Sequence, residues 1–443
     1  MSMHTDKADV ISTIECWIEA LRADDPERML PFLSRDFTFN GRTREEYVAD
    51  LARFSRKSSI YDVSRASVSF DGDQAVVEPV WRSENITSSA LSVSLVREDG
   101  QWKIATYAPG DMMPTELGIP ELGAQYVELL ERVVAEQTRW IGSILDADPP
   151  NGGDLARRQA AMRMFDETAH LRSARLLAPL REFFHARIRR AVEEIRSEIV
   201  TAGAVIWKLY NHGWVIKTPN HCWGHDITTG PQGMEYPVEL LDAIFDEIEV
   251  LFGSHWHGDH VRMSIVERAV EKGLPVLLPE FPEGETGEWL RSEFNRLGEE
   301  AGDRWTAEIV PPGTAGQVAG LSYVAFPGHQ VKEIPNNIVM VSADGVNIMQ
   351  TGDQSYDPDF EWIDKVGETH RVDLMLPNVW TFDMPRVVEG VQPRVVIPGH
   401  ENELTHTFGH RESYDKGYEI LNQLECEWHI ITWGEKYVLT PVE

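Results

Sequence analysis

The chain lacks the features that mark a secreted or a membrane protein. It has only three cysteines in 443 residues, Cys16, Cys222 and Cys426, and they form no CxxC pair. Apolar runs stay well short of the roughly 20 residues that a membrane helix needs. The N-terminal stretch MSMHTDKADV has no basic segment followed by an apolar one. We therefore expect a cytoplasmic protein without disulfide bonds.

Basic residues are also scarce. The chain has 41 Lys and Arg against 72 Asp and Glu, a formal net charge of −31. Such an acidic surface repels phosphate backbones and anionic lipid headgroups, so we expect neither a nucleic-acid partner nor a membrane partner. The hydrophobic content of 42% and the charged content of 26% are typical of a globular chain, and the length predicts about three domains.

The periodicity of apolar residues divides the chain into three segments. Residues 1–110 begin with helical spacing and continue with period-two runs, which predicts an α+β domain with helices packed on one curved sheet. Residues 111–200 have apolar stripes at helical spacing and predict a helical connecting segment. In residues 201–443, short apolar strands alternate with helical stretches. The predicted fold class is therefore α+β multidomain.

The N-terminal segment resembles small cone-shaped domains of the SnoaL and ketosteroid-isomerase type. The resemblance rests on the pieces ADDPERMLPFLSRDFTFNG and DGQWKIATY and covers about 105 residues by pattern rather than by an invariant motif. Domains of this type bind a ligand in the cone or serve as dimerising scaffolds. Because the segment offers no persuasive catalytic set, we expect a scaffold or ligand-binding role and a homodimer formed through it.

A dense group of potential metal ligands follows the apolar run EVLF. Residues 254–260 read SHWHGDH. Because side chains two apart in an extended segment face the same way, His255 and His257 can reach one metal together, while Asp259 and His260 turn toward a second. Imidazoles and a carboxylate at this spacing suit divalent zinc, iron or manganese.

Together with this group, further residues resemble the signatures of the metallo-β-lactamase-fold superfamily. They are Asp226 in HCWGHDITTG, His329 in VAFPGHQ, Asp353 in IMQTGDQSY and His400 in VVIPGHE. Each follows a β-type run, in the superfamily's order, although the usual Asp-Pro-Gly style turn is altered after Asp226. The resemblance covers about residues 200–440 and implies a C-terminal αβ/βα sandwich.

The resemblance also implies a dinuclear site. The ligands would be His255, His257 and His329 for the first metal, Asp259, His260 and His400 for the second, and Asp353 as the bridge. Asp226 would orient a ligand imidazole or the ligand loop through hydrogen bonds. Two divalent ions are expected, with zinc preferred and iron or manganese as alternatives.

The implied activity is that of an enzyme that hydrolyses an ester, lactone, thioester, amide or phosphoester of a small molecule. A metal-bridging hydroxide would attack, so no Ser or Cys nucleophile is needed, and Asp259 would shuttle the proton to the leaving group. An iron-dependent oxygenase or dioxygenase on the same fold is the alternative. Further histidines near the expected site, His221, His225 and His406, are candidates for substrate contact.

Overall fold

The structure is a computed structural model that describes most of the chain in two compact units. The described residues are 3–22, 26–38, 43–51, 59–63, 66–84, 87–110, 120–170, 177–231, 234–379, 381, 383–401, 404 and 413–441. One unit comprises Met1–Arg132 with His170–Ala174, and the other comprises Val133–Ala169 with Arg175–Glu443. Within the described part, no helix combines the length and the apolar character needed to cross a membrane.

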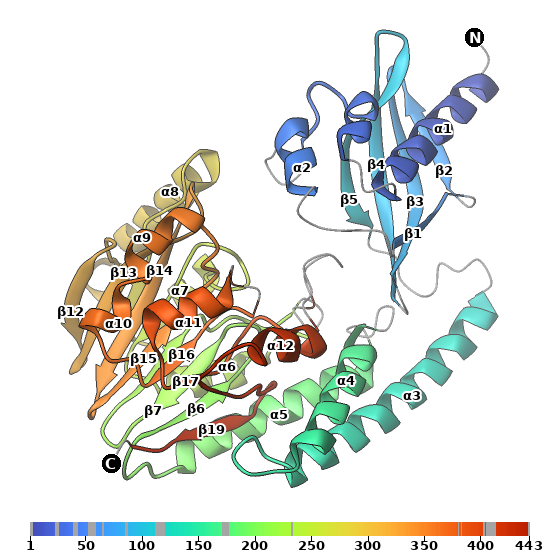
Figure 1. The fold of residues 1–443 in the computed structure, drawn as a ribbon. Coiled ribbons are helices and arrows are strands. Elements are labelled where there is room, and N and C mark those ends of the chain that lie inside the picture. Colours follow the sequence, from blue (N-terminus) through green and yellow to red (C-terminus); the bar gives the residue numbers. More distant parts are fainter. Residues whose placement is uncertain are drawn as a thin grey trace. The chain divides into compact units, whose positions relative to one another are not determined.

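The N-terminal unit packs helices on an antiparallel sheet (Figure 1). Its elements are α1 (Met3–Arg22), η1 (Pro26–Phe32), α2 (Arg44–Leu51), β1 (Ser59–Asp62), β2 (Ser67–Asp71), β3 (Gln74–Glu84), β4 (Thr87–Glu98) and β5 (Gln101–Gly110). The strand order is β1-β3-β4-β5, with β2 paired to β3. Val10, Ile14 and Trp17 of α1 are buried in one core with Val77 and Ile104 of the sheet. The segment thus mixes helices and a sheet as predicted, and its SnoaL-like character stays a prediction.

The C-terminal unit contains two seven-stranded mixed sheets, here called sheet 1 and sheet 2. Sheet 1 has the order β11-β10-β9-β8-β7-β6-β19, and sheet 2 has the order β12-β13-β14-β15-β16-β17-β18. The strands of sheet 1 are β6 (Ala204–Lys208), β7 (Trp214–Lys217), β8 (Cys222–His225), β9 (Leu251–Phe252), β10 (Val276–Leu278), β11 (Ala307–Ile309) and β19 (Lys436–Leu439). Those of sheet 2 are β12 (Thr314–Val318), β13 (Leu321–Val331), β14 (Ile334–Ala343), β15 (Val346–Gln350), β16 (Leu374–Leu376), β17 (Val395–Val396) and β18 (Glu427–Trp428).

The two sheets face each other across one apolar core. Ile206, Trp214 and Phe252 of sheet 1 are buried in the same cluster as Val341 and Ile348 of sheet 2. Burial of this many β-branched and aromatic side chains is the main favourable term that holds the sheets together.

Helices cover the outer faces of the two sheets (Figure 1). On sheet 1, α5 (Ala178–Ser197) contacts β6 and β7 through Glu194–Trp207 and Ile195–Lys217 hydrogen bonds, and α7 (Met263–Glu271) packs on β10. On sheet 2, Trp362 of α9 (Phe360–Ile363) stacks on Phe326 of β13, and α11 (Met384–Val391) contacts α9 and α10 (Val366–Thr369). The layers run αββα, which agrees with the αβ/βα sandwich predicted for this part of the chain. The remaining helices of the unit are α6 (Val238–Phe245), α8 (Glu285–Ala301) and α12 (Tyr414–Leu421).

Most of the predicted connecting segment belongs to the C-terminal unit. Its helices are α3 (Pro120–Ala147), α4 (Leu155–His170) and α5. Arg158 of α4 is buried, and its guanidinium donates to both carboxylate oxygens of Glu435 and to the carbonyl of Ile430. Arg187 of α5 donates to the carbonyl of Trp433 at 2.7 Å. These contacts explain why α4 and α5 belong to the same compact unit as the sandwich.

Replacing Arg158 with Met should therefore destabilise the whole C-terminal unit, because Glu435 would keep a buried charge without its main partner. We expect a loss of about 3–5 kcal/mol in unfolding free energy, the usual cost of breaking a buried ion pair. Urea unfolding of the full chain, followed by tryptophan fluorescence, measures it. Arg163→Met is the matched control on the same helix, since Arg163 pairs with Asp415 in solvent; an equal, small effect of both variants would contradict the prediction.

Candidate metal centre

The predicted ligands meet at one edge of the sandwich because each lies at or just beyond the end of a strand. Asp226 follows β8, the 255–260 loop follows β9, Asp353 follows β15 and His400 follows β17. His329 lies near the end of β13, beside an irregularity in its pairing with β14. Strands that run parallel present their carboxyl ends at the same edge, so loops far apart in sequence converge there.

Asp353 lies at the centre of this group and is 1% exposed. Its Oδ1 lies 3.1 Å from His260 Nε2 and 3.5 Å from His400 Nε2, while its Oδ2 lies 3.6 Å from His255 Nε2. The two carboxylate oxygens therefore face different imidazoles. This is the arrangement that a carboxylate bridging two ions requires.

Two groups of three potential ligands are already assembled around Asp353. Asp259, His260 and His400 form one group, and His255, His260 and Asp353 form another; in each, the ligand atoms lie within 4.8 Å of one another. The first group is the ligand set expected for the second metal. Asp259 Oδ2 lies 3.1 Å from His400 Nε2 within it.

The remaining expected ligands lie at the rim of this cluster. His257 is half-buried, and its ring centroid lies 4.7 Å from that of His255. The His329 side chain is 32% exposed. Neither residue belongs to the close groups found among the described residues, so the structure does not bring His255, His257 and His329 together as one such group.

Hydrogen bonds hold His255 and His260 in the tautomer that a metal ligand needs. Asp226 accepts from His260 Nδ1 at 2.8 Å and from Ser254 Oγ at 2.7 Å. Because the single Ser254 hydroxyl proton goes to Asp226, Ser254 Oγ accepts from His255 Nδ1 at 3.1 Å. Both imidazoles are thus protonated on Nδ1, and both Nε2 atoms are buried without a hydrogen-bond partner among the described residues.

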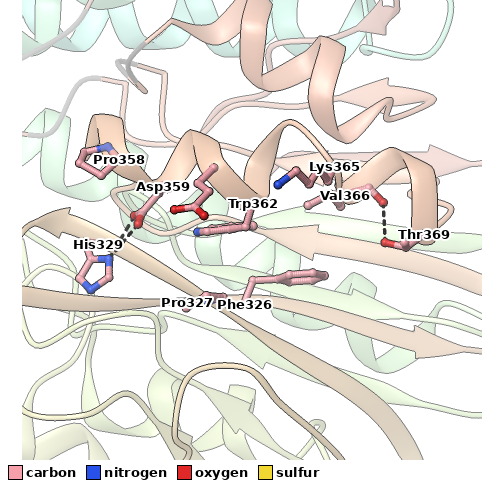
Figure 2. A pocket seen from close by; sticks show the side chains of 10 residues that line it. Phe326, Pro327, His329, Pro358, Asp359, Trp362, Lys365, Val366 and Thr369 are labelled. Atoms are coloured by element: carbon pink, nitrogen blue, oxygen red, sulfur yellow. Dashed lines mark hydrogen bonds and ion pairs between the residues drawn. The ribbon is translucent and has the colours of Figure 1, made fainter.

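His329 is oriented in the same way by a different carboxylate (Figure 2). Its Nδ1 donates to Asp359 at 3.1 Å, and Gln354 accepts from its backbone N–H at 2.9 Å while donating to Asp359 at 2.8 Å. A groove of about 590 Å³ begins beside this pair. It is lined by Phe326, Pro327, His329, Pro358, Asp359, Glu361, Trp362, Lys365, Val366 and Thr369.

The cluster contains three buried carboxylates, whose negative charge favours a bound cation. Asp226, Asp259 and Asp353 are all at least nine-tenths buried. Burial would raise the pKa of Asp353, but the neighbouring His260 and His400 outweigh it and hold that pKa well below its usual range. Burial likewise would lower the pKa of His260, but the surrounding carboxylates hold it well above its usual value. Buried carboxylates persist only when paired or metal-bound, so this donor set fits divalent ions.

The histidines proposed for substrate contact lie elsewhere or outside the described residues. His221 precedes β8, at the strand end opposite Asp226, and bonds to Glu249 at 3.0 Å. His225 is buried, stacks on Phe252 and accepts from Trp223 Nε1. The expectation for His221 and His225 is therefore corrected: one lies at the wrong end of the strand, and the other is packed in the interior. His406 lies outside the described residues.

Sequence reasoning missed several buried polar residues that contact the ligands. Asn211 Nδ2 donates to Asp259 Oδ2 at 2.9 Å, Asn378 Nδ2 donates to Asp353 Oδ1 at 2.5 Å, and Gln350 Nε2 donates to Asp226 Oδ2 at 2.7 Å. The only sequence signal was a polar residue at the end of an apolar run. Asn211 falls in a hairpin turn, which made its polarity unremarkable.

A buried ion pair between Lys208 and Glu401 lies next to His400. Lys208 and Glu401 are both fully buried and paired, and Lys208 Nζ also donates to the carbonyl of Pro398 at 3.2 Å. Burial lowers the pKa of Lys208 and raises that of Glu401, each against the charge of its partner. Because Lys208 is taken up by Glu401, it does not neutralise the carboxylates of the cluster.

No model of a known family matches the chain, and none of the curated proteins matches it either. Among solved structures, a metallo hydrolase from Ignicoccus hospitalis is 14% identical with a TM-score of 0.42, covering 53% of this chain and 98% of its own. The metallo-beta-lactamase fold protein YhfI from Bacillus subtilis is 10% identical with a TM-score of 0.38, covering 53% and 99%. CmlA, a diiron beta-hydroxylase from Streptomyces venezuelae, is 11% identical with a TM-score of 0.40, covering 55% of each chain. Likeness of this degree says nothing about the reaction.

Asp226→Asn should weaken metal binding without unfolding the protein. Asn tolerates the positive φ of 45° at this position, but it replaces an anion that accepts from His260 with a neutral amide. We expect a loss of roughly 10–100-fold in metal affinity, measured by competition with a chromophoric chelator. Asp344→Asn, at another turn with positive φ (48°) away from the ligands, is the control; equal affinities in both variants would contradict the role given to Asp226.

Proposed function

We propose that the chain is a metal-dependent hydrolase that binds two divalent ions, zinc by preference, and cleaves an ester, lactone, thioester, amide or phosphoester of a small molecule. One observation carries the proposal: His255 and His260 each have Nδ1 held by an oxygen acceptor, and their buried Nε2 atoms face Asp353 at 3.6 and 3.1 Å. Imidazoles oriented through Nδ1 in this way suit zinc.

In this proposal the residues of the chain divide the work. Two bound ions would acidify water and polarise the scissile carbonyl or phosphoryl group. Asp353, whose two oxygens face different imidazoles, would be a ligand of both ions. Asp259, 9% exposed, would take a proton and pass it to the leaving group. The groove beside His329 has the size of a small-molecule pocket.

A second candidate is oxygen chemistry on iron. The group of His255, His260 and Asp353 contains two imidazoles and one carboxylate, the donor composition typical of non-haem iron oxygenases. Oxygen dependence separates this candidate from hydrolysis.

The wider expectations complete the proposal. We infer a protein that works in the cytoplasm as a homodimer, with the N-terminal α+β unit as a SnoaL-like scaffold and with no nucleic-acid or membrane partner. The net charge of −31 supports the last point.

Asp353→Asn should weaken the binding of one ion and reduce turnover by orders of magnitude, because it keeps the size of the bridge and removes its charge. Excess zinc or manganese should restore part of the activity. Metal content by mass spectrometry and hydrolysis of p-nitrophenyl acetate and bis-p-nitrophenyl phosphate measure the two effects. Asp364→Asn, in a solvent-exposed pair with Arg386, is the control; full metal content and activity in Asp353→Asn would overturn the bridging role.

An assay without oxygen separates hydrolysis from oxygen chemistry. Hydrolysis takes its new atom from water, so the zinc-loaded wild type should turn over esters, lactones or thioesters at the same rate in air and under argon. Activity only in air and only with iron would favour the oxygenase.

A further inference from the structure

The tight turn between β6 and β7 contacts the candidate metal centre. It consists of Asn211, His212 and Gly213, closed by hydrogen bonds from Leu209 N–H to Gly213 O and from Gly213 N–H to Tyr210 O. Asn211 and His212 are completely buried. Asn211 has a φ of 55°, a conformation that side chains other than Gly, Asn and Asp rarely adopt.

Asn211 joins two ligands that are far apart in sequence. Its side-chain Nδ2 donates to Asp259 Oδ2 at 2.9 Å, and its backbone carbonyl accepts from the N–H of His400 at 3.2 Å. Because a carboxylate only accepts hydrogen bonds, the contact with Asp259 also settles which way the amide points. His400 itself has a φ of 73°, so its loop needs an external contact to stay in place.

His212 is linked by hydrogen bonds to the third ligand of the same group, His260, through two intermediate side chains, Gln350 and Asp226. Gln350 donates from Nε2 both to His212 Nδ1 at 3.0 Å and to Asp226 Oδ2 at 2.7 Å, and its Oε1 accepts from Gly352 N–H. Asp226 in turn accepts from His260. The His212 ring also fills the space under the His400 loop, since a Cβ on Gly399 would lie 2.0 Å from His212 Cδ2.

The direct hydrogen bonds of the turn go to one group of ligands. The turn touches Asp259 and His400 directly and His260 through Gln350 and Asp226. His255 is held by Ser254 and is linked to the turn only at one further remove, through Ser254, Asp226 and Gln350, while His329 is held by Asp359 and Gln354. Among the described residues, no hydrogen bond that the structure shows links the turn directly to His255, His257 or His329.

We propose that the turn Asn211–His212 is a positioning element for one of the two ions, the one bound by Asp259, His260 and His400. The amide of Asn211 holds Asp259 in its ligating orientation, and the Asn211 carbonyl together with the His212 ring places His400. The proposal rests on the two-metal site of the proposed function, but it concerns which ion the turn serves and not the reaction.

The test is metal titration of the full-length apoprotein with Co²⁺, followed by visible absorption and by calorimetry. Asn211→Gly keeps the backbone conformation and removes the amide. It should retain one tight site and weaken the other by roughly 10–100-fold, the usual effect of losing a residue that orients a ligand. Asn211→Asp should weaken the same site at least as much at neutral pH, because it places a second carboxylate against Asp259.

Asp344→Gly is the matched control, because it also removes a hydrogen-bonding side chain at a turn with positive φ in the same unit. It should leave both sites unchanged. Two unchanged sites in Asn211→Gly, or equal weakening of both, would overturn the selective role. If Asn211→Gly does not fold, Asn211→Asp, with its near-identical size, decides by the same criteria. If the wild type binds no Co²⁺, the proposed function is overturned. If the wild type and Asn211→Gly both bind two Co²⁺ ions with equal affinity, only this inference is overturned.

Discussion

The candidate metal centre depends on the hydrogen bonds that the buried carboxylate of Asp226 accepts. This carboxylate accepts from Ser254 through both N–H and hydroxyl, from His260 and from Gln350, at distances of 2.7–2.8 Å. Burial would raise its pKa, but the charge of His260 and these hydrogen bonds lower it to about 2. Asp226 therefore stays ionised, and through it the structure sets the tautomers of His255 and His260 at once.

Around this carboxylate, polar side chains are placed in a second ring that orients the ligands. Ser254 and Gln350 serve the imidazoles, while Asn211 and Asn378 donate to the carboxylates of Asp259 and Asp353. Each donor sits at the end of a strand or in a tight turn, where the backbone is held by the sheets. The site is therefore built on rigid elements, which is what precise ligand geometry requires.

Hydrogen bonds also join the helical segment to the C-terminal sandwich. Arg158 and Arg187 reach from α4 and α5 to the turn before β19, which pairs with β6. The turn that carries Asn211 follows β6 directly. The helices α4 and α5, which the sequence analysis assigned to a connecting segment, therefore contact the turn before β19, and β19 pairs with the strand β6 that precedes Asn211.

The spacing of residues along the sequence predicted much of the fold and of the candidate site. The HxHxDH motif, the strand-end positions of Asp226, Asp353 and His400, and the alternation of strands and helices all depend on neighbouring residues, so the sequence could predict the sandwich and the clustering of most candidate ligands. Tertiary structure alone decided the rest. Asn211, Asp259 and His400 are separated by 48 and 141 positions. His221 and His225 lie close to Asp226 in sequence, yet His221 bonds to Glu249 and His225 stacks on Phe252. The periodicity of apolar residues does not indicate which buried side chains contact one another, because sheet register and strand direction set those contacts.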